Sequence, residues 1–280
     1  MHWQWPVGAA LAFLLAFVTT PAGVSGAVLL LPLQLSVLHV PSPSVTPTNL
    51  LFNVAATPGG LLRFAREHRV RGPLPRLLVA GTLPGVVAGA ILRVELLSGG
   101  RTFELIVAFV LFPLGLWLIL GAQRVSRPRP EPSAGGRRLT WLLALVVGTI
   151  GGIYGIGGGS VLAPILIAMG YSVYEVAPAT LAATFLTSLA GIVTYQVLQV
   201  IHHGAIAPQW VLGACLGAGG FAGSYCGARL QRHLPERSLR RLLGVVACLV
   251  AARYLQTGFA SADGPAKTRT LAGATLRPTS

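Results

Sequence analysis

The chain has 280 residues, of which 53% are hydrophobic and 10% are charged, and its net charge is +14. A soluble domain carries about 25% charged residues, so this composition excludes a soluble protein and predicts an all-α, multi-pass membrane protein with about 8–10 membrane segments. The positive charge lies in short arginine clusters between apolar runs and not in one basic domain, which argues against nucleic-acid binding.

The first apolar run, residues 7–40, is broken near its middle by Gly23-Val24-Ser25-Gly26. Its flank lacks the Lys or Arg of a signal peptide, so we expect a retained hairpin of two short helices, with a cleaved leader as the alternative. The two arms, residues 7–21 and 27–39, would be about 22 and 20 Å long as helices, less than the thickness of a hydrocarbon core. A polar helix (46–64), a glycine-rich helix (77–92) and an apolar helix (103–121) follow.

The second half repeats this plan after a linker rich in Pro, Gly and Arg. Residues 139–170 are broken by Gly155–Ser160, and a polar helix (176–199), a glycine-rich helix (210–230) and an apolar helix (239–255) follow. We therefore predict two transmembrane repeats, residues 1–122 and 139–257, a cytoplasmic linker over 123–138 and a disordered tail over 258–280. An offset of 132 residues superposes Gly23 on Gly155 and Gly26 on Gly158, and it also superposes Gly81 on Gly213 and Gly85 on Gly217.

Three arginine clusters, within residues 63–76, 124–138 and 229–241, determine the predicted topology. If each broken run crossed the membrane once, the third cluster would lie opposite the other two, against the positive-inside rule. If each run enters and returns as a hairpin, all three clusters share the cytoplasmic side. The second arrangement gives two repeats of inverted orientation, each a glycine-broken hairpin plus three helices, with both termini outside.

Short, interrupted segments at matching positions of two inverted halves are typical of a transporter's binding site. The glycines let backbone N–H groups face a ligand at a helix N-terminus, which favours an anion. The polar helices add neutral donors, although interhelical hydrogen bonding explains these equally well. The predicted substrate-binding residues are Gly23, Ser25, Gly26, Asn49, Asn53, Gly155, Gly157, Gly158, Gly159, Ser160, Thr180 and Thr184. For the glycines of the glycine-rich helices we instead predict close helix packing.

Several activities lack support in the sequence. No catalytic triad or nucleotide-binding motif is present, and His202-His203 has no third ligand nearby, so we expect no enzyme, no metal site and no cofactor. None of the seven acidic residues lies at the centre of a predicted span, where an ion-coupled transporter usually keeps one. The coupling is left open between other groups, passive flux and an anion gradient.

The doubled glycine turn resembles that of the sulfite exporter TauE/SafE family, over residues 7–255. The resemblance rests on GIYGIGGGSVLAP in the second half and on its weaker counterpart GVSGAVLLLP in the first, where one serine-containing turn replaces the triple glycine. It implies transport of sulfite or organosulfonates across the bacterial inner membrane, usually by export. The family's glycine motif falls on Gly155, Gly157, Gly158, Gly159 and Pro164, and on Gly23, Gly26 and Pro32.

We therefore predict an inner-membrane permease that moves a small anion by alternating access. The expected partners are the lipid bilayer and the anion, and a homo-oligomer is left open. Two other functions remain as alternatives: an anion channel, and a non-transporting scaffold or assembly partner.

Overall fold

A computed structural model describes residues 4–38, 40, 44–67, 72–95, 134–202 and 207–260, with a few further residues between 109 and 120. Within this part of the chain every regular element is a helix. The elements are α1 (Gln4–Thr19), η1 (Thr20–Ala22), α2 (Ala27–Ser36), α3 (Val45–Arg66), α4 (Pro73–Glu95), α6 (Ala134–Tyr154), α7 (Gly158–Ala168), α8 (Val173–His202), α9 (Trp210–Gln231) and α10 (Glu236–Ala260).

Some predicted segments fall outside the described residues: most of the apolar helix at 103–121, most of the linker, and the tail beyond residue 260. At two boundaries the helices are longer than we expected. Helix α6 begins at Ala134, so the last five residues of the predicted linker are helical. Helix α10 continues to Ala260, past the predicted end of the second repeat.

The all-helical membrane architecture is confirmed. Within the described residues, four stretches are long and apolar enough to cross a bilayer: Trp5–Ala22, Pro73–Glu95, Val173–Ile201 and Trp210–Gln231. By contrast, α2 and α7 have 10 and 11 residues, which is about 15–16 Å of helix. These two short helices follow the glycine breaks, so each broken run consists of one longer and one shorter helix.

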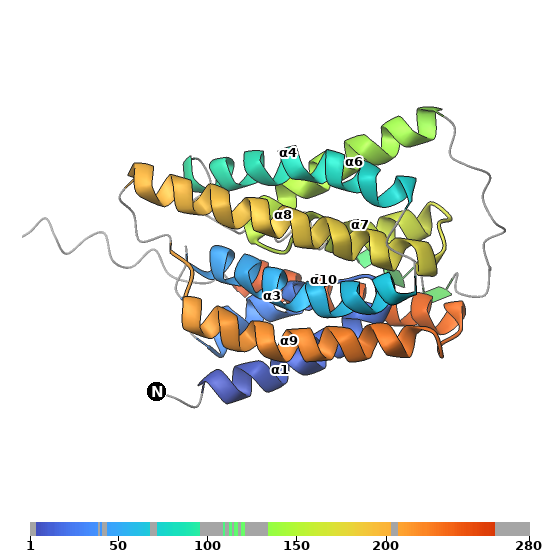
Figure 1. Cartoon of the computed structure of the whole chain (residues 1–280), viewed down its shortest axis with the longest axis horizontal. Coiled ribbons are helices and arrows are strands. Elements are labelled where there is room, and N and C mark those ends of the chain that lie inside the picture. Colours follow the sequence, from blue (N-terminus) through green and yellow to red (C-terminus); the bar gives the residue numbers. More distant parts are fainter. Residues whose placement is uncertain are drawn as a thin grey trace, which may run out of the picture.

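The helices form two layers, seen one above the other in Figure 1. One layer holds α1, α3 and α9. A side chain on Gly219 or Gly227 of α9 would collide with the backbone of Ala9 or Phe17 of α1, and Gly213 of α9 lies against Leu51 of α3. Residue numbers rise together along the α1–α9 contact, so these two helices run parallel, and Figure 1 shows α3 alongside them.

The second layer holds α4, α6 and α8, with α7 packed against α6 and α8. Gly81 and Gly89 of α4 face the backbone of Trp141 and Thr149 of α6 in the same parallel manner. The layers meet where α3 crosses α8. The predicted close packing of the glycine-rich helices is thus confirmed at these positions.

The glycines of α4 and α9 do not correspond at the predicted offset. Gly81 and Gly85 pack against α6, whereas Gly213 and Gly217 pack against α3. The glycines of α9 that face α1 are Gly219, Gly223 and Gly227. The superposition of Gly81 on Gly213 and of Gly85 on Gly217 at an offset of 132 residues therefore does not extend to the helices that these glycines pack against.

The described arginines of all three clusters lie at one end of the bundle. Helix α3 ends at Arg66 and α4 begins seven residues later, and α10 begins five residues after α9 ends. Because α3 runs beside α9 and α4 beside α6, these helix ends coincide (Figure 1). This grouping agrees with the arrangement in which each broken run is a hairpin.

Candidate functional site

The two glycine breaks meet in the interior, between the layers. The backbone N–H of Ser25 donates to Oγ of Ser160 at 3.2 Å, which joins the first hairpin to the second. Both residues are almost fully buried. The structure thus brings the two predicted turns together, although they are separated by more than 130 residues.

The first turn is held against α8. Gly23 has φ +79°, and an added Cβ would lie 2.6 Å from Cα of Ala177, so glycine is required both by conformation and by space. Oγ1 of Thr180 donates to the carbonyl oxygen of Gly23 at 2.8 Å and also lies 2.8 Å from the carbonyl of Val176. The Thr180 hydroxyl is therefore already used within the protein.

Amide side chains of α3 tie down the rest of the first hairpin. Oγ of Ser25 donates to Oδ1 of Asn53 and accepts from the N–H of Ala27, the first residue of α2. Nδ2 of Asn53 reaches the carbonyl of Gly155 at 3.4 Å. Nδ2 of Asn49 donates to the carbonyl of Ala27 at 3.1 Å. These predicted binding residues all have protein partners.

Gln34 of α2 joins the same network. Its Nε2 donates to Oδ1 of Asn49 at 3.0 Å, while its Oε1 is buried without a partner. The orientation of the Gln34 amide follows from that of Asn49. Nδ2 of Asn49 faces the Ala27 carbonyl, so only Oδ1 of Asn49 is left for Gln34, and Gln34 must turn its NH₂ group toward it.

The second turn leads directly into α7. Gly157 has φ +70°, and a Cβ there would lie 2.7 Å from Cγ2 of Thr184 and 3.1 Å from Oγ of Ser188. The N–H of Gly158 donates to Oγ1 of Thr187 at 3.3 Å. Gly159 lies directly against Oγ1 of Thr184. The first N–H groups of a helix have no partner within it, so this end of α7 is a positively polarised surface that faces α8.

Two hydroxyls at this surface have no partner. Thr184 and Ser188 lie one turn apart on α8, their side chains are 0% exposed, and neither hydroxyl makes a hydrogen bond. Neighbouring hydroxyls behave differently: Thr187 and Thr194 donate to the carbonyls four residues before them. A buried hydroxyl without a partner costs about 1–3 kcal/mol, so this pair needs an explanation such as a ligand.

A small cavity of about 20 Å³ lies beside Ser160, the one polar residue among those that line it. This space holds roughly one water molecule, so this cavity is too small for a polyatomic anion. The described carboxylates, Glu67, Glu95, Glu175 and Glu236, all lie at or next to helix ends. Among the described residues no group of His, Cys, Asp and Glu side chains has the geometry of a metal site.

Sequence reasoning named Thr184 as a candidate but omitted Ser188 and Gln34 from the predicted site. Ser188 was recognisable from its spacing, because it follows Thr184 by four residues on the same helix face. Gln34 was recognisable as the single amide in the mostly apolar second arm of the first run.

Known proteins match this chain over nearly its whole length. Residues 8–254 match the family model described as sulfite exporter TauE/SafE. The probable membrane transporter protein YunE of Bacillus subtilis (strain 168) is 24% identical, over 85% of this chain and 93% of its own length. The probable membrane transporter protein ORF9 of Sinorhizobium sp. is 26% identical, over 87% of this chain and 89% of its own length.

Proposed function

This chain belongs to the sulfite exporter TauE/SafE family of membrane transporters, and from that premise we propose that it carries a small anion, sulfite or an organosulfonate, across the bacterial inner membrane. The observation that carries the proposal is the pair of buried, unpartnered hydroxyls of Thr184 and Ser188 beside the N-terminus of α7. Neutral hydroxyl donors and backbone N–H groups together suit an oxyanion, because the helix end adds partial positive charge without a buried cation.

In the proposed site the anion lies against Gly157–Gly159 and accepts hydrogen bonds from Thr184 and Ser188. Ser160 lies at the edge, where the cavity begins. The first hairpin has a different role. Ser25 and Asn53 hold Ser160 and the Gly155 carbonyl, so they position the second turn and contact the anion less directly than we expected from the sequence.

We propose alternating access between two inverted repeats as the mechanism. The packing supports this: α1 pairs with α9 of the other half, and α6, the corresponding helix of the second half, pairs with α4 of the first. Each of these pairs runs parallel. Exchange of partners between halves fits an inverted repeat, and such repeats rock around a central site.

The test is sulfite flux into proteoliposomes that contain the purified protein, with empty liposomes as background. We expect saturable flux in the parent protein and its loss when Thr184→Val and Ser188→Ala are combined, because both hydroxyl donors are removed with little change in shape. Thr194→Val is the matched control on the same helix, since its hydroxyl bonds to the Ala190 carbonyl, and it should retain the flux.

If the double variant, correctly folded, transported as fast as the parent, the assignment of the site to these hydroxyls would be wrong. If the parent moved neither sulfite nor any of a panel of sulfonates, the anion class itself would be wrong.

A further inference from the structure

We propose that α10 is the movable wall of the route by which the anion reaches the α7 turn, and that Leu243, Val246 and Ala247 determine the size of the anion admitted. This inference rests on the proposed function, but it concerns residues outside the proposed binding site.

The cavity beside Ser160 has two kinds of wall. Its inner wall comes from the hairpins: Val24 and Val28 from the first, and Val161 and Pro164 from α7. Its outer wall is α10, which contributes Leu243, Val246 and Ala247. These three residues are spaced i, i+3 and i+4, so they form one face of the helix. On this side the cavity is therefore bounded by α10.

The inner wall is held by hydrogen bonds. Ser25 is bound to Ser160 and Gly158 to Thr187, and Thr180 fixes Gly23. The contact that α10 makes with the cavity consists of three apolar side chains. Apolar surfaces slide past one another without breaking a directional bond, so the part of α10 that lines the cavity can move without breaking a hydrogen bond there, whereas its start is held by Glu236 at the N–H of Val173. A cavity of about 20 Å³ must enlarge before an oxyanion enters.

The opposite face of α10 offers a matched control. Val245 is 45% exposed and Leu249 is 57% exposed, whereas Val246 is 4% exposed. Neighbouring valines of the same helix thus point in different directions, one to the cavity and one outward. The same substitution at position 245 or 246 therefore changes the same residue type on the same helix, once on the outward face and once on the face toward the cavity.

The first experiment compares sulfite flux in proteoliposomes for Val246→Trp and Val245→Trp. We expect Val246→Trp to lose most of the flux because the indole fills the cavity, and Val245→Trp to keep it. Shortening the same side chain should have the converse effect: Val246→Ala should raise the flux of a bulkier sulfonate relative to sulfite, and Val245→Ala should leave that ratio unchanged. Equal flux ratios in the two alanine variants, or retained flux in Val246→Trp, would overturn the inference.

A second measurement has labelling as a readout besides transport and does not require folding with a bulky residue. In a background with Cys215→Ser, Cys226→Ser and Cys248→Ser, we would introduce Val246→Cys or Val245→Cys and measure labelling by N-ethylmaleimide in membranes. The reagent needs a thiolate in contact with water and forms a thioether that sulfite does not cleave. We expect faster labelling at 246 than at 245, followed by loss of flux only at 246.

The outcomes separate the two proposals. Fast labelling at 246 in a protein that moves no anion would leave the route standing and reject the proposed function. Sulfite flux in the parent, together with no labelling at 246 and normal flux in Val246→Trp, would reject the role of α10 and leave the proposed function intact.

Discussion

At the scale of single residues, the interior holds two kinds of buried polar side chain. Asn53 has two partners, Ser25 and the Gly155 carbonyl, and so contributes to holding the hairpins together. Thr184 and Ser188 have none. Removal of a partnered group leaves others unsatisfied, whereas replacement of an unpartnered hydroxyl by an apolar group of similar shape removes a desolvation cost. Stability and transport should therefore respond in opposite ways at these positions.

We predict that Asn53→Ala lowers the free energy of unfolding by about 1–3 kcal/mol, and that Thr184→Val leaves it unchanged or raises it while transport falls. Thermal unfolding of the purified protein in detergent, measured beside the flux assay, checks both. A loss of stability in Thr184→Val as large as that in Asn53→Ala would mean that the threonine hydroxyl is structural after all.

The identity of the turn was readable from the sequence, but the roles of its residues were not. Glycines at matched breaks of two apolar runs are a local signal, and they led to Gly155–Ser160. Whether a hydroxyl or amide is already bonded depends on residues far along the chain. Thr180 meets Gly23 across 157 positions and Asn53 meets Gly155 across 102. A single sequence without such contacts cannot distinguish Thr180 from Thr184.

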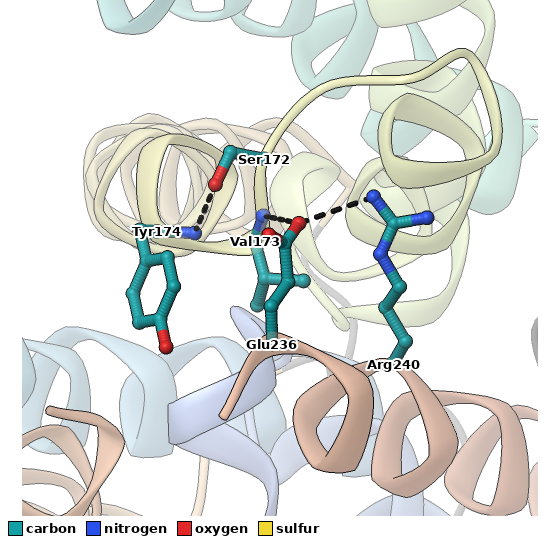
Figure 2. Close-up of polar contacts among 5 residues, drawn as sticks. All are labelled: Ser172, Val173, Tyr174, Glu236 and Arg240. Carbon is teal, nitrogen blue, oxygen red and sulfur yellow. Dashed lines mark hydrogen bonds and ion pairs between the residues drawn. The ribbon is translucent and has the colours of Figure 1, made fainter. Parts of the chain in front are cut away.

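At the scale of elements, the start of α10 is fastened to the start of α8. Figure 2 shows the carboxylate of Glu236 between the N–H of Val173, at 3.4 Å, and the guanidinium of Arg240, at 3.1 Å. A carboxylate at the N-terminus of α8 is stabilised by the partial positive charge of that helix end. Tyr174 adds a hydrogen bond from its hydroxyl to the carbonyl of Leu234 at 2.7 Å. This contact anchors one end of the helix that we propose to move.

We predict that Glu236→Gln lowers stability by about 1 kcal/mol, because it removes the negative charge that both the α8 end and the nearly buried Arg240 face. Glu175→Gln is the matched control, since Glu175 is an exposed carboxylate in the first turn of α8 itself. The measurement is again thermal unfolding in detergent. A smaller shift in Glu236→Gln than in Glu175→Gln would show that the contact does not fasten α10.

The order and approximate limits of the helices followed from hydrophobic runs and glycine breaks, whereas the register between halves did not. Two glycine-rich helices can be superposed at several offsets, because glycine is frequent in both. Packing distinguishes them: Gly85 of α4 faces Leu145 of α6, and the glycine of α9 in the corresponding position against α1 is Gly223, which faces Phe13. Which offset applies is decided by these contacts between helices, and they join residues far apart in the sequence.

At the scale of the whole molecule, the arrangement predicts which side of the membrane each end occupies. The described arginines of the three clusters share one end of the bundle, and the start of α1 and the end of α10 lie at the other (Figure 1). The positive-inside rule places the arginine end in the cytoplasm, so both termini should be periplasmic. Lys267, Arg269 and Arg277 near the C-terminus work against this placement, which makes the C-terminus the informative position.

We therefore predict that alkaline phosphatase fused after residue 280 is active, because the enzyme needs the periplasm, and that the same enzyme inserted within residues 123–133 is inactive. A green fluorescent protein fusion is the complementary probe, expected to be dark at the C-terminus and bright in the linker. A fluorescent C-terminal fusion would place α10 in the opposite direction across the membrane relative to the arginine clusters. That result would contradict the hairpin arrangement of the broken runs and, with it, the inverted relation of the two halves on which alternating access depends.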